Sequence, residues 1–261
     1  MEYFVWNADP VLFSWGPVTV RWYGLLFAVG FFQGFVILNW MFRREGRPVE
    51  DLDDLFVYVF IGVLVGARLG HCLFYDPGFY LSHPVEILKI WNGGLASHGG
   101  AIGVLLAGYY FSRRKKGYTA LWMLDRGALP LATVSVFIRM GNLFNSEIVG
   151  LETTAPWAFV FERVDSVARH PVQLYEALTY LVISGVMLFG YLKWVSRMAD
   201  GFLIGVYMVL MFSARFFLET FKTRQASYEA DYFWSIGQWL SVPFILAGIF
   251  LIFRGYRLRK V

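Results

Sequence analysis

The sequence predicts an all-α polytopic membrane protein with seven transmembrane helices, its amino terminus outside the cell and its carboxyl terminus in the cytoplasm. Of the 261 residues, 57% are hydrophobic and 20% are aromatic, and the mean hydropathy is +0.52. A soluble globule of ordinary composition does not carry so much apolar surface. The apolar residues also form long runs, which are separated by short basic clusters.

Seven apolar runs define the expected helices, because about 20 helical residues are needed to cross a hydrocarbon layer of about 30 Å. The windows are residues 18–42, 52–75, 98–112, 120–140, 172–192, 201–221 and 236–253. The third is the shortest, and glycines crowd its beginning, where they lower helix propensity but allow close backbone approach. We expect a single membrane domain over residues 1–261, in which 141–171 form the longest outer loop.

Lysine and arginine predict the orientation of these helices. Most basic residues outside the windows lie after the first, third and fifth windows and in the carboxyl-terminal tail. The alternate loops hold fewer, namely Lys89, Arg163, Arg169, Lys222 and Arg224. Because cytoplasmic loops carry the excess of positive charge, the amino terminus is expected outside. The same clusters account for the net charge of +4, so we expect no nucleic-acid binding.

Cysteine and histidine usage argues against a resident metal. The single cysteine, Cys72, lies in an apolar run, so an intramolecular disulfide and a cysteine-based zinc cluster are excluded. No histidine or carboxylate pair stands at a dependable ligand spacing. We therefore expect no metal and no other cofactor.

Polar side chains approach one face of the predicted bundle. In the topology above, the outer ends of the windows carry Tyr23, Arg68, His98, Arg139, Arg215 and Glu219. Ionisable groups inside a membrane are rare and usually functional. These residues are therefore the first candidates for a site at the outer leaflet.

Arg139 and Arg215 are suited to holding a phosphate diester. Each guanidinium offers a planar fork of donors, and a surrounding of low dielectric strengthens its contact with an anion. We interpret the pair as a clamp for a phospholipid headgroup. The alternative is that each arginine pairs with a carboxylate, such as Glu147 or Glu219, and only stabilises helix packing.

His98 is a candidate base, because it lies among glycines in Gly93-Gly-Leu-Ala-Ser-His98-Gly-Gly100. The glycines would let a lipid or a peptide backbone approach the ring. An imidazole can accept a proton from a thiol near neutral pH. The alternative is an interfacial histidine that is hydrogen-bonded to the backbone and has no chemical role.

Seven short motifs follow one another along the chain, and together they resemble the bacterial phosphatidylglycerol:prolipoprotein diacylglyceryl transferase family over nearly the whole length. The motifs are Arg21-Trp-Tyr23-Gly24-Leu, Gly66-Ala-Arg68-Leu-Gly70, Gly93-Gly-Leu-Ala-Ser-His98-Gly-Gly100, Arg139-x-Gly-Asn142-x-x-Asn145-x-Glu147-x-x-Gly150, Arg169-His-Pro-x-Gln173-Leu-Tyr-Glu176, Arg215-Phe-x-x-Glu219 and Gly237-Gln-x-Leu-Ser241. Each is modest alone, whereas their order on these windows is highly specific.

The resemblance implies a seven-span enzyme of the bacterial cytoplasmic (inner) membrane, with its active site facing the outer leaflet. Such an enzyme moves the diacylglyceryl group of phosphatidylglycerol onto the lipobox cysteine thiol of a prolipoprotein signal peptide. The products are a thioether and glycerol phosphate. Its implied partners are phosphatidylglycerol, the prolipoprotein and the lipid bilayer.

The resemblance also implies roles for particular residues. Arg139 and Arg215 would hold the phosphate, and the substrate-binding residues would further include Arg68, Asn142, Glu147 and Gly150. Tyr23, His98 and Glu219 would complete the catalytic region. His98 is the preferred base, and the alternative is that His98 is structural while Glu147 or Glu219 accepts the proton.

The chain departs from the family pattern at three positions. The family commonly has glycine where Ser146 stands, tyrosine where Met211 stands and arginine where Lys222 stands. Lysine cannot make the bidentate contact of arginine, and the methionine removes one possible hydrogen bond. A headgroup or gating role does not transfer directly to Lys222.

Two other classes of function compete with the enzyme, a non-catalytic membrane transporter and a phospholipid-binding scaffold. Transporters usually show inverted repeats or broken helices with polar groups near the membrane midplane. Here the polar groups gather at one end of the predicted helices. The enzyme is therefore the preferred hypothesis.

Overall fold

The computed structural model describes residues 3–16, 18–90, 93–94, 96–223 and 233–259. Within these ranges, six helices are long and apolar enough to cross a membrane. They are α1 (Trp22–Arg44), α2 (Val49–Phe74), α6 (Ala120–Phe144), α7 (Val172–Trp194), α8 (Phe202–Leu218), which runs on into the 3-10 turn η2 (Glu219–Phe221), and α9 (Ile236–Arg257). The chain is therefore a polytopic membrane protein. Helix α5 (Ser97–Arg114) coincides with the third predicted window.

The chain divides into two compact units. The first comprises Met1–Ile37 together with Leu124–Val261, and the second comprises Leu38–Met123. Helices α7, α8 and α9 belong to the first unit. The second contains α2, α5 and, between them, the short helices α3 (Pro77–Ser82) and α4 (Pro84–Ile87).

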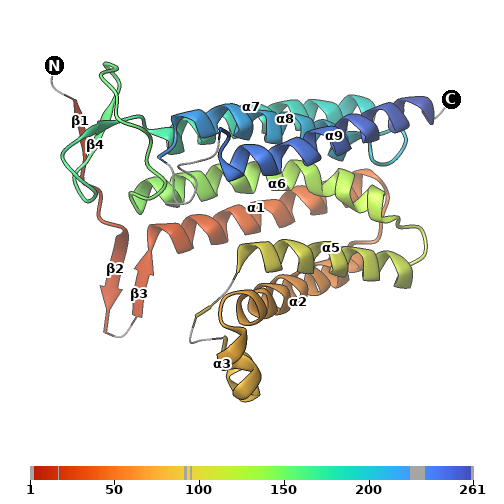
Figure 1. The fold of residues 1–261 in the computed structure, drawn as a ribbon. Helices are drawn as coiled ribbons and strands as arrows, with labels where there is room; N and C mark the ends of the chain where they lie inside the picture. The colour runs from red at the N-terminus through yellow and green to blue at the C-terminus, as the bar shows by residue number, and fades with distance from the viewer. Residues whose placement is uncertain (1–2, 17, 91–92, 95, 224–232, 260–261) are drawn as a thin grey trace. The chain divides into compact units, whose positions relative to one another are not determined.

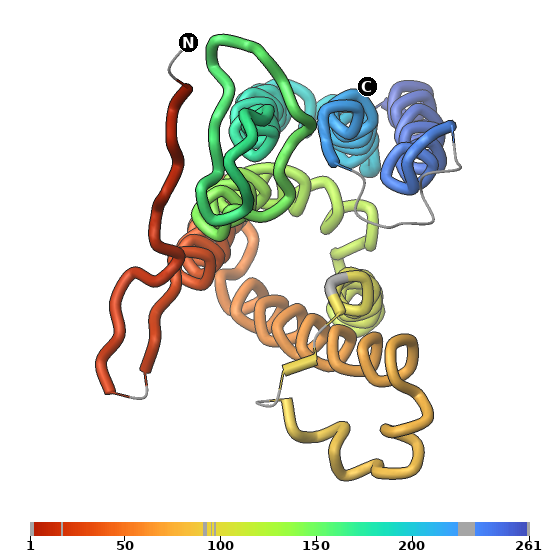
Figure 2. Tube along the Cα trace, turned by 60° about the vertical axis from the view of Figure 1, so that its left-hand side comes forward, coloured from red at the N-terminus to blue at the C-terminus, as the bar shows by residue number. Residues whose placement is uncertain are grey.

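In the first unit, α8 lies between α7 and α9 (Figures 1 and 2). Glycines make the contact between α8 and α9 close, because a Cβ built on Gly205 or Gly248 would lie 2.8 Å from the other's carbonyl oxygen. Small residues allow helices to approach in this way inside a membrane. Residues on α7 and α8 are thereby held at defined positions beside the start of α9.

Asp125 on α6 fixes the beginning of α8. Its carboxylate accepts hydrogen bonds from the backbone N–H groups of Gly201 and Ile204, each at 2.8 Å. The first N–H groups of a helix have no partner within the helix, so an acceptor there stabilises the start of the helix. The neighbouring Arg126 lies 3.6 Å from Asp200 and 4.0 Å from Asp125. This polar cluster joins α6 to α8 at the end of α8 opposite Arg215.

In the second unit, α2 and α5 pack against each other and run in opposite directions. A Cβ on Gly66 or Gly99 would collide with the other's carbonyl oxygen, so the two backbones touch directly. At the far end of this pair, Lys115 lies 2.7 Å from both Asp51 and Asp54. These two features fix the register in which α5 runs along α2.

Five short strands supplement the helices in the described residues. Strand β1 (Phe4–Trp6) runs parallel to β4 (Phe159–Phe161), which pairs antiparallel with β5 (Ala168–Arg169). Strands β2 (Val11–Trp15) and β3 (Val18–Arg21) form a hairpin. The first predicted window therefore began too early, because residues 18–21 pair as a strand before α1 begins.

The loop predicted for residues 141–171 begins later than the sequence suggested. Helix α6 continues to Phe144, so Asn142 still lies within it. The Trp6 indole N–H donates to the carbonyl of Leu143 at 3.0 Å, and the sheet of β1, β4 and β5 orders the loop beyond. The end of α6 is thus held by a segment from the beginning of the chain.

Candidate functional site

Arg139, near the end of α6, is held by two acceptors. Its Nε lies 3.1 Å from Oε2 of Glu176 on α7, and its Nη1 donates to Oδ1 of Asn142 at 3.1 Å. The Asn142 amide in turn donates to Oε1 of Glu147 at 2.7 Å. These contacts fix the orientation of the guanidinium, as a preorganised anion site requires.

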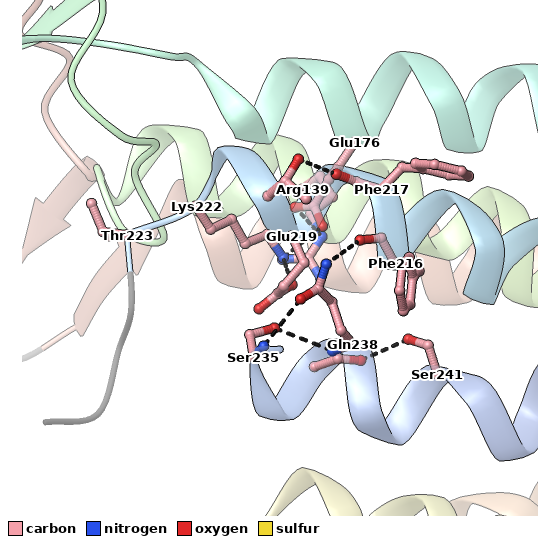
Figure 3. Close-up of polar contacts among 12 residues, drawn as sticks. Arg139, Glu176, Phe216, Phe217, Glu219, Lys222, Thr223, Ser235, Gln238 and Ser241 are labelled. Carbon is pink, nitrogen blue, oxygen red and sulfur yellow. Dashed lines mark hydrogen bonds and ion pairs between the residues drawn. The ribbon is translucent and has the colours of Figure 1, made fainter. Parts of the chain in front are cut away.

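Glu176 is the centre of a buried ionic network (Figure 3). Its carboxylate is fully buried, and its Oε1 lies 2.9 Å from Nζ of Lys222. The same amino group lies 3.0 Å from Oε2 of Glu219. A buried charge is costly unless it is paired, and here two carboxylates face one guanidinium and one ammonium group. The carboxylate that pairs with Arg139 is therefore Glu176, and Glu219 pairs with Lys222.

Arg215, near the end of α8, differs from Arg139 in having spare hydrogen-bonding capacity. Its Nε is buried and has no hydrogen-bond partner among the described residues. On α7, the Tyr180 hydroxyl donates to Oε1 of Glu176 at 3.3 Å. A buried donor without a partner is costly, so Arg215 suits an anion that enters from outside the protein.

The turn after α6 is strained. Ser146 and Ile148 have positive φ values of 52° and 57°, a region that L-residues rarely adopt and that is especially unfavourable for a β-branched side chain. Glycine, which the resemblance implies at the position of Ser146, would adopt this conformation without strain. The turn places Glu147 between Asn142 and Asn145, and the Gln173 amide holds its carbonyl at 2.7 Å.

Gly150 lies where the loop crosses the segment after α8. Its N–H donates to the carbonyl of His170 at 3.1 Å, and a Cβ at this position would collide with that residue. On either side, Leu151 donates to the carbonyl of Phe221 at 2.7 Å and Thr223 donates to that of Val149 at 3.3 Å. Gly150 thus lets the loop approach His170 closely, while the residues on either side of Gly150 pair with the chain that carries Lys222.

Tyr23 and Glu219 each pack against a glycine. A Cβ on Gly141 would lie 2.7 Å from the Tyr23 ring, and one on Gly237 would lie 2.7 Å from the Glu219 carboxyl carbon. Gln238, the next residue of α9, donates to the carbonyl of Phe216 at 3.2 Å (Figure 3). The first unit therefore gathers Tyr23 and Glu219 with the end of α6, the start of α7 and the end of α8.

His98 and Arg68 belong to the second unit. His98 is exposed in the first turn of α5. Arg68 is buried on α2, with only 4% of its surface exposed. Its guanidinium donates to backbone carbonyls of the α4 region and of Gly93 and Gly94, so most of its donors have partners within the protein.

Sequence reasoning left Glu176 and Lys222 out of the candidate site. One signal was available for Glu176, because it is the only acidic residue of α7, and an ionisable group inside a membrane helix suggests a function. Lys222 was set aside because it replaces an arginine of the family pattern. Its role in the network depends on two carboxylates that lie far apart in sequence, and nothing in the local sequence indicates their proximity.

Acidification is expected to loosen the loop at Asp165. This carboxylate accepts hydrogen bonds from Nη2 of Arg169 at 2.6 Å and from its Nε. The Arg169 guanidinium holds the pKa of Asp165 below its usual range. Because the folded pKa is lowered, the stabilisation is fully present above the unfolded value of about 3.9 and is lost as the pH falls through the lower folded value.

Hydrogen exchange of residues 150–169, corrected for intrinsic rates, measures this effect across the acidic range. Protection in the wild type should fall as Asp165 takes up its proton. In Asp165→Asn, which lacks the titrating group, protection at these residues should be lower at neutral pH and should change less with pH. An identical pH response in both proteins would show that the pair does not stabilise the loop.

Comparisons with known proteins identify the same family along almost the whole chain. A family model described as prolipoprotein diacylglyceryl transferase matches residues 10–254. A relative from Tolumonas auensis is 54% identical over 247 residues, covering 95% of each chain. One from Chloroherpeton thalassium is 49% identical over 98% of this chain and 96% of its own. One from Bacteroides fragilis is 41% identical over 95% and 94%. All three are named phosphatidylglycerol–prolipoprotein diacylglyceryl transferase.

Proposed function

Because the chain belongs to the prolipoprotein diacylglyceryl transferase family, we propose that it transfers the diacylglyceryl group of phosphatidylglycerol to the lipobox cysteine of prolipoproteins. The observation that carries the site assignment is the contrast between Arg139, near the end of α6, and Arg215, near the end of α8. Glu176 and Asn142 orient the Arg139 guanidinium, whereas the buried Nε of Arg215 has no hydrogen-bond partner among the described residues. The first is a preorganised donor and the second has a donor available for the phosphate.

The reaction is a nucleophilic displacement at carbon. The substrate thiol loses its proton to a base, and its sulfur forms a bond to the glyceryl methylene carbon of the lipid. The bond between that carbon and the phosphate oxygen breaks, and its electron pair leaves with glycerol phosphate. Arg139 and Arg215 stabilise the negative charge that develops on the phosphate. The enzyme needs no cysteine of its own, because the nucleophile belongs to the substrate.

We assign the base to His98 and give Glu147 and Glu219 supporting roles. Glu219 lies 3.0 Å from the Lys222 ammonium, and Glu147 accepts hydrogen bonds from Asn142 and Asn145. Both carboxylates are thus already engaged by donors within the protein. His98 is exposed in the first turn of α5, where it is open to a substrate.

The proposal includes the topology that brings lipid and prolipoprotein to this site. We take α5 as the third of seven spans, because it is 18 residues long and ends in Arg113 and Arg114. Basic residues likewise end α1, α7 and α9, which supports cytoplasmic ends for these helices. The amino terminus is then outside the inner membrane and the site faces the outer leaflet.

Mass spectrometry of a reconstituted reaction tests the function directly. Purified protein, phosphatidylglycerol and a lipobox peptide should yield a peptide whose mass increases by one diacylglyceryl group. A peptide with serine in place of the lipobox cysteine should give no product, and neither should phosphatidylcholine in place of phosphatidylglycerol. Absence of the thioether product, while a relative of the family is active in the same vesicles, would reject the proposal.

A further inference from the structure

Arg68 makes an unusual number of contacts with the backbone of its own unit. Its Nε donates to the carbonyl of Ile87 at 2.9 Å, and its Nη2 donates to that of Glu86 at 2.6 Å. Its Nη1 donates to the carbonyls of Gly93 and Gly94, at 2.5 Å and 3.2 Å. These bonds connect α2 to two places in the segment that follows α3.

The contacts leave Arg68 little capacity to bind a phosphate. A guanidinium has five N–H donors, and four hydrogen bonds to carbonyl oxygens already engage it. The Cζ atom of Arg68 lies 5.1 Å from the centre of the Tyr80 ring, and only 4% of the surface of Arg68 is exposed. Arg215, with its buried donor free of any described partner, shows the opposite pattern. A substrate-binding role therefore fits Arg68 poorly.

The segment that Arg68 holds leads directly to His98. Gly93 and Gly94 have φ values of +83° and +73°, so the chain turns there in a conformation that favours glycine. A Cβ on Gly94 would lie 2.8 Å from Arg68 Nη1 and 2.5 Å from the His71 ring. Two residues later, the N–H of Ala96 donates to the carbonyl of Ala67 at 2.9 Å. Consecutive residues of α2 thus set the path of the chain as α5 begins.

We propose that Arg68 is a positioning residue that fixes the start of α5 and thereby the location of His98. The proposal rests on the function assigned above, in which His98 takes the proton of the substrate thiol. A base acts only within hydrogen-bonding reach of its proton, and a displacement of about 1 Å can reduce a rate about 100-fold. Arg68 therefore acts on the reaction through His98 and not through the lipid headgroup.

Kinetics of Arg68→Lys separate this role from headgroup binding. Lysine keeps the charge but loses the planar fork that reaches four carbonyls. We expect kcat to fall about 100-fold, while KM for phosphatidylglycerol changes little. Gly94→Ala should reproduce this loss, because its Cβ would lie 2.8 Å from Arg68 Nη1 and disturb the contact between Arg68 and this segment. Lys89→Ala, which removes only the Lys89–Glu86 ion pair at the edge of the segment, should leave turnover and KM unchanged.

A double-mutant cycle supplies a readout that general destabilisation would not change. In a His98→Ala background the base is already absent, so adding Arg68→Lys should lower the residual rate little further. Multiplicative losses would overturn the proposal, and so would a rise in KM for phosphatidylglycerol that accounts for the whole effect of Arg68→Lys. The second result would make Arg68 a headgroup ligand.

Hydrogen exchange tests the positioning of α5 without any turnover. Arg68→Lys should raise exchange at the amide of Ala96, which bonds to Ala67, and leave exchange at Ser241 on α9 unchanged. Unchanged exchange at Ala96 would overturn the proposal even if the kinetics agreed. If the wild-type protein makes no thioether product, the proposed function fails, whereas the exchange result still shows whether Arg68 holds this segment.

Discussion

Arg215→Ala is expected to lower the rate of diacylglyceryl transfer about 10²–10³-fold, the loss typical of removing one preorganised donor from a developing anion. The Arg215 Nε is buried without a described hydrogen-bond partner, and Arg215 forms no ion pair with another residue in the part of the chain that the structure describes. Its removal should therefore affect the reaction far more than the fold. Arg139 cannot replace it, because Glu176 and Asn142 fix that guanidinium in place.

Two further variants make the Arg215 prediction specific. Arg215→Lys keeps the charge without the bidentate fork, so its rate should lie between those of the wild type and the alanine variant. Arg254→Ala is a matched control, because Arg254 lies on α9 and donates to the carbonyl of Asp200 at 2.8 Å, next to the start of α8. Its rate should stay within about twofold of wild type. Wild-type turnover in Arg215→Ala, measured by mass spectrometry of the peptide, would remove Arg215 from the phosphate site.

The sequence predicted the helices well because their signal is local. Each apolar window contains a helix or most of one, although the first window also takes in β3, and the fourth and fifth windows begin where α6 and α7 begin. The strands could not be predicted in the same way. The pairing of Phe4 with Phe159 joins a residue that precedes α1 to one that follows α6, and neither three-residue strand has a sequence pattern of its own. Non-local pairing of this kind requires the folded chain.

The candidate site shows the same division between local and non-local information. The exposed position of His98 at the start of α5 follows from the glycines before it and the apolar run after it. The partners of Arg139 and Lys222 meet only when α6, α7 and α8 pack together. The contacts of Arg68 could not be predicted from the sequence for another reason. Its acceptors are backbone carbonyls, which any residue type can supply. A side-chain pattern cannot show whether an arginine binds a ligand or its own backbone.

Glu176→Gln is expected to destabilise the protein by about 3–5 kcal/mol, the usual result of removing one partner from a buried ion pair. The amide keeps the shape of the side chain but not its charge. Lys222, whose side chain is 8% exposed, would then keep Glu219 as its described partner, and Arg139 would lose the carboxylate with which it pairs. Thermal unfolding in detergent measures the loss. Glu162→Gln, a change at an exposed glutamate, is the matched control and should shift stability by less than about 0.5 kcal/mol.

A second substitution separates the structural part of this effect from the catalytic part. Lys222→Met in the Glu176→Gln background removes the excess positive charge, and it should restore much of the lost stability because an apolar replacement of a buried pair is often neutral. Turnover should not return, since Arg139 still lacks the carboxylate that orients its guanidinium 3.1 Å away. A double variant less stable than Glu176→Gln would show that the ionic network does not carry the stability. Recovery of both stability and turnover would show that Glu176 only balances charge and does not position Arg139.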